Sequence, residues 1–295
     1  MLKGNSILNM RNNQLKKIDT VNYNQLVLVV LGFFILSCND KQQSNAQKET
    51  PQNFQNKGHE LIYKMVKKVG DYNILSNKKD VIYTYTYQTP DGKSDISTEK
   101  YIFDGELSYG LYQHHERTFS DLEGPIEQGY DGSEYWLKHN GKILNDSIRL
   151  KRVAFNRPTN FYWFAMFQKL LDPGLNYEYI GEKVINDINY DIVKVTFNST
   201  DEKPTDIYQL FINSKTSLVD QFLFTVVDFG VMEIPNLMQL KYEQIDGMLI
   251  PTKRQYKKST WNADVSEEPW INVTWSNIQF NNDLSKEDFS KLSKN

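Results

Sequence analysis

Alternating apolar and polar positions run through most of the chain from residue 80 onward. In the segment 80–88, Val81, Tyr83, Tyr85 and Tyr87 fall on one face, and β-branched residues fall on the other. Period-two alternation of this kind predicts a half-buried β-strand. The same pattern predicts strands near residues 80–88, 96–103, 106–113, 126–130, 134–138, 176–185, 190–198, 206–213, 217–228, 237–244, 248–257 and 270–280.

Asp-Gly and Asn-Gly pairs separate many of these segments and tolerate the positive φ that tight hairpins require. They are Asp91-Gly92, Asp104-Gly105, Asp131-Gly132, Asn140-Gly141 and Asp246-Gly247. Strands joined by such turns pair in sequence as an antiparallel meander, and a sheet of about a dozen strands curls or closes. We therefore expect a mainly β fold with a few helices. One large curved antiparallel sheet forms an incomplete barrel, and helices cover its concave side.

Two segments depart from the strand pattern. Residues 58–69 place apolar side chains at helical spacing with lysines between them, and Gly70 ends this amphipathic helix. A second helix is expected to begin at Arg157-Pro158-Thr159-Asn160 and to continue through 161–171. Its apolar residues leave hardly any polar face, which indicates burial nearly all round. The second helix is either a core helix that plugs the sheet or a lid over an apolar ligand cavity.

The first 37 residues have the pattern of an export signal. Basic residues precede an uncharged run of 11 apolar residues from Leu26 to Leu36. That run is shorter than the roughly 20 residues of a membrane-spanning helix. It ends in Ile35-Leu36-Ser37-Cys38, which resembles the bacterial lipobox and implies cleavage before Cys38 and acylation of its thiol. An ordinary signal peptide with a chance cysteine, or an uncleaved anchor, is the alternative.

The domain boundaries follow from composition. We expect a lipoprotein signal peptide at 1–37, a flexible polar tether at 38–57 and a single β-rich envelope domain at 58–295, since the tether has almost no apolar residues. Without the four basic residues and one acidic residue of the signal, 30 basic and 36 acidic residues remain, a formal charge of −6. A nucleic-acid partner is not expected, because phosphate binding needs a basic surface.

The strongest motifs of catalysis are absent from the sequence. It contains no Gly-rich phosphate loop, GxSxG, HExxH or CxxC. His114 and His115 are adjacent on a predicted strand and should point to opposite faces, so they do not predict a shared metal. Acidic residues are plentiful, but the sequence does not pair them. We therefore predict no catalytic residue, metal or cofactor, and we favour a protein that is not an enzyme.

The export signal, lipid-bearing cysteine, tether, helix and interrupted meander together resemble the LolA/LolB-like superfamily of lipoprotein carriers and receptors. The nearer likeness lies in the strands 190–195 and 208–213, in 217–224 and in the late strand start Gly247-Met248-Leu249-Ile250-Pro251-Thr252. The mature chain also looks like an uncharacterised family of Bacteroidota envelope lipoproteins. The resemblance implies a half-barrel whose concave apolar side binds an acyl chain or a similar hydrophobe. The basic residue with which the carrier engages acyl chains is not located by motif here.

These observations predict a lipid-anchored envelope protein, in the outer membrane and facing the periplasm, that binds or carries a lipid or lipidated protein. The expected apolar ligand wall consists of Tyr83, Tyr85, Tyr87, Phe161, Trp163, Phe164, Phe167, Phe222 and Phe224. Because the same residues would equally make a dry core, a structural or interaction lipoprotein with a filled core is the alternative. An envelope hydrolase is the third possibility. The sequence makes no prediction of oligomeric state.

Overall fold

A computed structural model describes residues 53–199 and 203–292 of the chain. Its main element is one antiparallel sheet of 13 strands with the spatial order β6-β5-β4-β3-β2-β1-β13-β12-β11-β10-β9-β8-β7. The strands are β1 (Asp80–Gln88), β2 (Ser94–Ile102), β3 (Leu107–His115), β4 (Ile126–Tyr130), β5 (Tyr135–His139), β6 (Lys142–Ile143), β7 (Leu175–Ile185), β8 (Ile188–Phe197), β9 (Ile207–Asn213), β10 (Val219–Val226), β11 (Val231–Ile245), β12 (Met248–Lys258) and β13 (Ile271–Phe280).

The sheet order shows an incomplete barrel. Every neighbouring pair is consecutive in the chain except β1 and β13, which join the two ends of the β region. β6 and β7 form the two edges, and they do not pair with each other. The predicted open, curved antiparallel sheet is therefore confirmed. All twelve predicted strands are present; β6 is additional, and β11 begins at Val231 rather than near residue 237.

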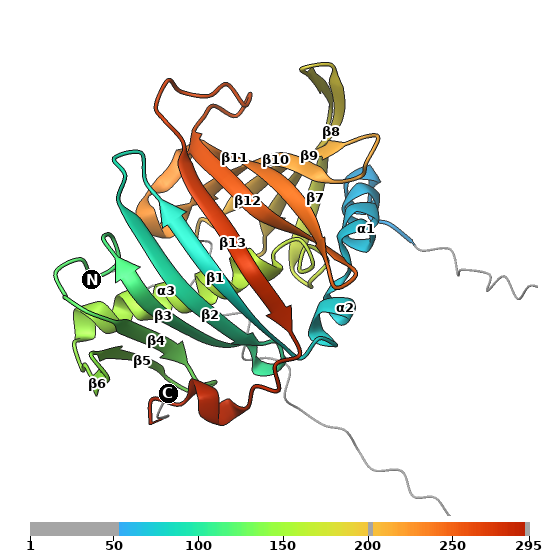
Figure 1. Ribbon diagram of the computed structural model, residues 1–295. Helices are drawn as coiled ribbons and strands as arrows, with labels where there is room; N and C mark the ends of the chain where they lie inside the picture. Colours follow the sequence, from blue (N-terminus) through green and yellow to red (C-terminus); the bar gives the residue numbers. More distant parts are fainter. Residues whose placement is uncertain (1–52, 200–202, 293–295) are drawn as a thin grey trace, which may run out of the picture.

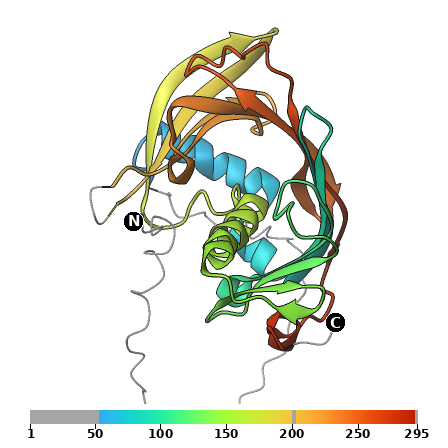
Figure 2. The ribbon, with the colours of Figure 1, turned by 90° about the vertical axis from the view of Figure 1, so that its left-hand side faces the viewer.

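Helices occupy the concave side of the curved sheet, as Figures 1 and 2 show. They are α1 (Lys57–Val69), the short α2 (Tyr72–Ser76) and α3 (Ser147–Ala165), and three 3-10 turns lie at η2 (Asp104–Glu106), η3 (Val227–Phe229) and η4 (Lys286–Phe289). α1 contacts β7, β8 and β12, whereas α3 contacts β3, β4 and β5. Because α3 connects the two edge strands in the chain, it crosses the open side of the half-barrel.

The helix expected at 158–171 was placed wrongly. α3 begins at Ser147, where the Asp146 side chain accepts hydrogen bonds from the amides of Ile148 and Arg149. Pro158, read as a helix start, lies inside the helix, and α3 ends at Ala165. The expected burial of 161–171 is confirmed in large part, since only Tyr162, Trp163, Lys169 and Leu171 are partly exposed. The error arose because proline is favoured in the first turn of a helix and is uncommon in its interior.

The amphipathic helix is confirmed as α1, with Ile62, Met65, Val66 and Val69 buried against the sheet. Asn56 caps it: its side-chain oxygen accepts the amide of His59, and its nitrogen donates to the carbonyl of Tyr177 on β7. Packed structure therefore already includes Asn56, within the segment expected as a tether. The signal peptide and Cys38 lie outside the described residues.

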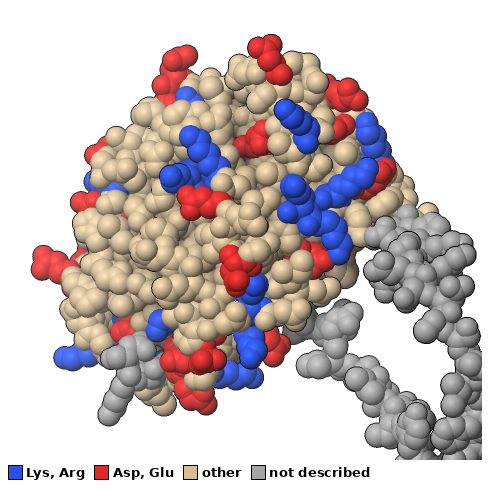
Figure 3. All heavy atoms as spheres, turned by 45° about the vertical axis from the view of Figure 1, so that its right-hand side comes forward, with Lys and Arg blue, Asp and Glu red and all other residues tan. Residues whose placement is uncertain are grey.

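No helix in the described ranges is long and apolar enough to cross a membrane. Acidic and basic side chains are interspersed over the face of the domain that Figure 3 shows. That face consequently presents no broad field of one sign to a polyanion.

Candidate functional site

The concave side of the sheet carries the aromatic residues predicted as a ligand wall. Seven of the nine side chains are buried, and Tyr85 and Trp163 are partly buried. Phe161 and Phe164 belong to one core cluster with Tyr83 and Tyr87 of β1. The remaining residues of the predicted wall, Phe167, Phe222 and Phe224, belong to a second cluster, against which Trp163 packs. The structure therefore brings the predicted residues together in two groups, which α3 and the turn after it connect.

These rings are in direct contact. The Phe164 ring stacks on Tyr83 with ring centroids 5.0 Å apart, and it lies 5.3 Å from the Trp275 ring. Trp163 meets Phe224 edge-on at 5.8 Å. In this conformation the predicted wall is packed as a core, which is the arrangement expected by the filled-core alternative.

A fully buried ion pair lies between the first half of α3 and the sheet. The Arg157 Nη1 donates to Glu99 Oε2 at 2.8 Å, and both side chains are inaccessible to solvent. Glu99 also accepts from the hydroxyl groups of Ser97 and Tyr101. Burial lowers the pKa of Arg157, but the charge and hydrogen bond of Glu99 together with Tyr112 and Tyr101 more than offset this, so the pKa lies above its usual value. The pair fixes the position of α3 on β2 because a buried charge needs its partner.

Gly110 of β3 makes room for this pair. A Cβ atom at that position would lie 2.5 Å from Arg157 Nη1 and 2.8 Å from Glu99 Oε1. Only glycine therefore allows the ion pair to lie directly over the strand.

A second buried arginine, Arg254 of β12, forms no ion pair with a carboxylate in the described part of the chain. Its Nη2 donates to the carbonyl of Trp163 at 3.0 Å, and its guanidinium lies 3.9 Å from the Trp275 ring centroid. The Nη1 atom is buried and has no hydrogen-bond partner among the described residues. Burial lowers the pKa of Arg254 to about 10. The group thus stays charged at neutral pH, and it holds the C-terminal half of α3 through a single backbone oxygen.

A pocket of about 120 Å³ opens between α3 and the ends of β1, β2 and β3. One wall is aromatic, and Tyr85, Tyr87 and Trp163 belong both to this wall and to the predicted ligand wall. The full lining is Tyr85, Tyr87, Asp95, Tyr112, Arg117, Thr118, Arg152, Phe155, Asn156, Thr159, Asn160 and Trp163.

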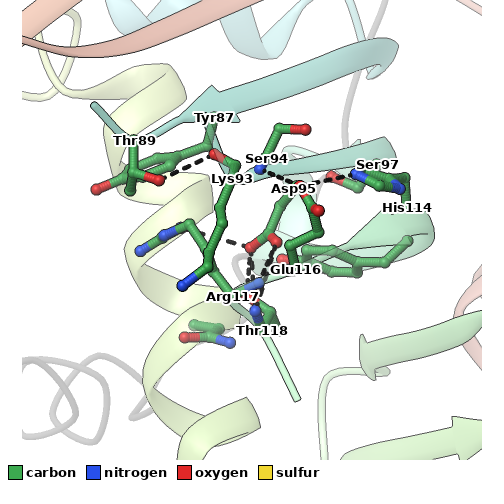
Figure 4. A network of polar contacts seen from close by, with 12 residues as sticks. Tyr87, Thr89, Lys93, Ser94, Asp95, Ser97, His114, Glu116, Arg117 and Thr118 are labelled. Atoms are coloured by element: carbon green, nitrogen blue, oxygen red, sulfur yellow. Dashed lines mark hydrogen bonds and ion pairs between the residues drawn. The ribbon is translucent and has the colours of Figure 1, made fainter. Parts of the chain in front are cut away.

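Asp95 organises the sheet side of the pocket, as Figure 4 shows. Its carboxylate accepts hydrogen bonds from the amide of Arg117 at 2.9 Å and from the hydroxyl of Thr118 at 2.8 Å. The Thr118 amide donates to it as well, at 3.2 Å. These bonds anchor the chain that follows β3. They also place the Arg117 guanidinium over the Tyr87 ring, with its central carbon 3.6 Å from the ring centroid.

The adjacent histidines His114 and His115 have different hydrogen-bond partners. His114 pairs with Glu116 at 3.1 Å, whereas His115 bonds to the carbonyl of Gly124. No group of three or more His, Cys, Asp or Glu side chains in the described parts of the chain is arranged to hold a metal ion.

The sequence reasoning missed the charged part of the site. A signal was present: on β2 the buried alternate positions are Asp95, Ser97, Glu99 and Tyr101, a polar series on a face that should be apolar. Polar residues at core positions of a strand require partners. Here those partners are Arg117, Thr118 and Arg157.

One segment of the chain matches a known protein family, and the fold is similar to several solved structures. Residues 133–233 match DUF6503, a family of unknown function. No curated protein matches the chain.

Solved structures similar to the chain include a DUF1329 family protein from Desulfovibrio piger, with 16% identity, 79% of this chain and 95% of that chain covered, and a TM-score of 0.44. A putative outer membrane lipoprotein-sorting protein domain from Vibrio parahaemolyticus has 10% identity, coverage of 80% and 97%, and a TM-score of 0.45. A LolA superfamily protein from Nitrosomonas europaea has 12% identity, coverage of 79% and 97%, and a TM-score of 0.46. The open 13-stranded sheet by itself confirms the incomplete barrel that the sequence predicts.

Proposed function

We propose that the protein is a lipid-anchored protein of the cell envelope that binds a hydrophobic ligand on the concave side of its half-barrel. The observation that carries the proposal is the pocket beside α3. Tyr85, Tyr87 and Trp163 connect its aromatic wall to the two buried aromatic clusters under α3, which together form an aromatic layer. Apolar pockets with a few polar groups are the usual sites of such ligands.

The pocket is smaller than the roughly 300–1,000 Å³ of typical ligand sites. A whole acyl chain therefore requires the C-terminal half of α3 to move away from the sheet. Pro158 favours such a movement, because it has no amide hydrogen and leaves the carbonyl of Ala154 without its helical donor. Arg254 supports such a movement as well, since its hydrogen bond to α3 is to a backbone carbonyl, that of Trp163.

The test uses the mature chain, residues 38–295, with Cys38→Ser to keep it free of lipid. It should bind a fluorescent acyl-chain probe saturably. Phe164→Ala should cost about 3–5 kcal/mol of stability, because it removes a buried ring. It should also strengthen probe binding, since it opens space under α3.

Phe211→Ala is the matched control. Phe211 is equally buried but belongs to the cluster with Tyr190, Leu223 and Leu237, apart from the two clusters that α3 joins. It should destabilise the protein by a similar amount and leave the probe affinity unchanged. If the folded parent protein shows no saturable binding, the proposal fails, and the filled-core structural lipoprotein replaces it.

A further inference from the structure

Arg152 of α3 lines the pocket. Its guanidinium carbon lies 5.7 Å from the ring centroid of Phe155 and 5.1 Å from that of Phe229. Among the described residues it makes no ion pair and no hydrogen bond, in contrast to Arg149 one turn earlier, which is paired with Asp121 and Asp146. Five N–H donors of Arg152 are therefore available to a ligand.

Arg117 lies on the opposite side of the same pocket, and its guanidinium is only weakly engaged. The ion pair from its Nη1 to Asp95 is 3.4 Å long. The Asp95 carboxylate is already satisfied by the amides of Arg117 and Thr118 and by the Thr118 hydroxyl. Most N–H donors of the Arg117 guanidinium are consequently available to a ligand.

The two guanidinium groups repel each other. Burial is the main cause that lowers the pKa of Arg152, and the positive charge of Arg117 is the second. Asp95, which also lines the pocket, offsets part of this repulsion, and a second anion between the two guanidinium groups would relieve the rest. Carboxylate and phosphate match the planar donor fork of arginine.

The rest of the lining favours a ligand that has an apolar part as well as a charge. Thr159 offers a buried hydroxyl that has no partner in the described chain. Tyr85, Tyr112 and Trp163 form an apolar wall behind the arginines. The pocket volume of about 120 Å³ holds a head group rather than a whole lipid.

We propose that this pocket binds the negatively charged head group, a carboxylate or phosphate, of an amphiphile, between Arg117 and Arg152. The inference rests on the proposed function and adds to it the charge of the ligand. The apolar tail of the amphiphile lies along the aromatic layer under α3, and the head group remains at the pocket mouth.

The test compares dodecanoate with dodecanol at fixed ionic strength, in competition with an uncharged fluorescent probe on the unacylated mature chain. The two ligands share a tail and differ in charge. The parent protein should prefer dodecanoate by about tenfold or more, as expected for charge-assisted hydrogen bonds. Arg117→Gln with Arg152→Gln should remove this preference by weakening the binding of dodecanoate.

Arg149→Gln with Lys93→Gln is the control, because it removes the same net charge from two residues outside the pocket lining. It should keep the preference. Arg152→Glu should reverse the preference, because it places a negative charge beside the head group of the ligand.

Equal binding of both ligands that does not respond to the arginine substitutions would overturn the head-group inference and leave the proposed function standing. Binding of neither ligand would refute the proposed function itself. If inorganic phosphate competes as well as dodecanoate does, the pocket is a site for a free anion, and the amphiphile inference is wrong.

Discussion

Arg157→Met should destabilise the protein by about 3–5 kcal/mol, because it leaves the Glu99 carboxylate buried without a counter-ion. Both side chains are fully buried, and the Nη1 to Oε2 distance is 2.8 Å. After the substitution only the hydroxyl groups of Ser97 and Tyr101 remain as donors to Glu99. Two neutral donors do not replace a full positive charge.

Glu99→Gln should cost a similar amount for the opposite reason. Arg157 would keep its charge, while its Nε atom already lacks a partner among the described residues. Its remaining acceptors would be the neutral amide oxygen of the glutamine and the Tyr112 hydroxyl at 3.3 Å. The double variant, Glu99→Gln with Arg157→Met, contains neither charge and should lose less stability than either single variant. The coupling energy should reach about 2 kcal/mol or more.

Urea unfolding followed by tryptophan fluorescence measures all four proteins of this cycle. Gly110→Ala provides an independent variant, since its methyl group would push into the same pair. It should be destabilising in the parent background and less so beside Arg157→Met. If the costs of the single substitutions simply add, or if each is below about 1 kcal/mol, the ion pair does not hold α3 in place.

Three further outcomes are expected. Burial raises the pKa of Asp206 to about 6 from its usual 3.8, so its ionisation opposes folding. The resulting loss of stability is small near pH 4 and complete above about pH 6. Asp206→Asn keeps an acceptor for the Val227 amide, and its stability advantage in urea titrations should grow from pH 4 to 7, to at most about 3 kcal/mol; an equal effect at both pH values would contradict this. Asn56→Ala should cost about 0.5–2 kcal/mol in thermal unfolding, because α1 loses its cap, and an unchanged melting temperature would show that the cap is dispensable. Cys38→Ser should abolish incorporation of labelled fatty acid and release the protein from the membrane fraction, and label retained by that variant would disprove lipidation at this cysteine.

The strands could be predicted because their signals are local. Alternation along 80–88 and the turn at Asp91-Gly92 lie within a few residues of the structure that they specify. The pairing of β1 with β13 could not be predicted in this way. Tyr85 and Trp275 are register partners, but most of the domain's sequence lies between them. Nothing in either segment alone selects the other as its partner.

The first half of α3 was missed for a different physical reason. Hydrophobic periodicity reveals a helix only when its buried face is apolar. Asn156 and Arg157 are buried here against Gln128 and Glu99, so the inner face of the helix reads as polar. The cap at Asp146 was the remaining local signal.

The two halves of α3 are attached to the sheet by different forces. Before Pro158, directional contacts hold it: Arg157 to Glu99 and Asn156 to Gln128, whose geometry no apolar ligand can reproduce. After Pro158, aromatic contacts dominate, and an acyl chain offers equivalent apolar surface because such contacts are not directional. The interruption of the helical hydrogen bonds at Pro158 falls at the boundary between these halves. A ligand that competes for the aromatic layer would therefore displace the C-terminal half of α3, while the ion pair keeps the N-terminal half, and with it Arg152, in position beside the pocket.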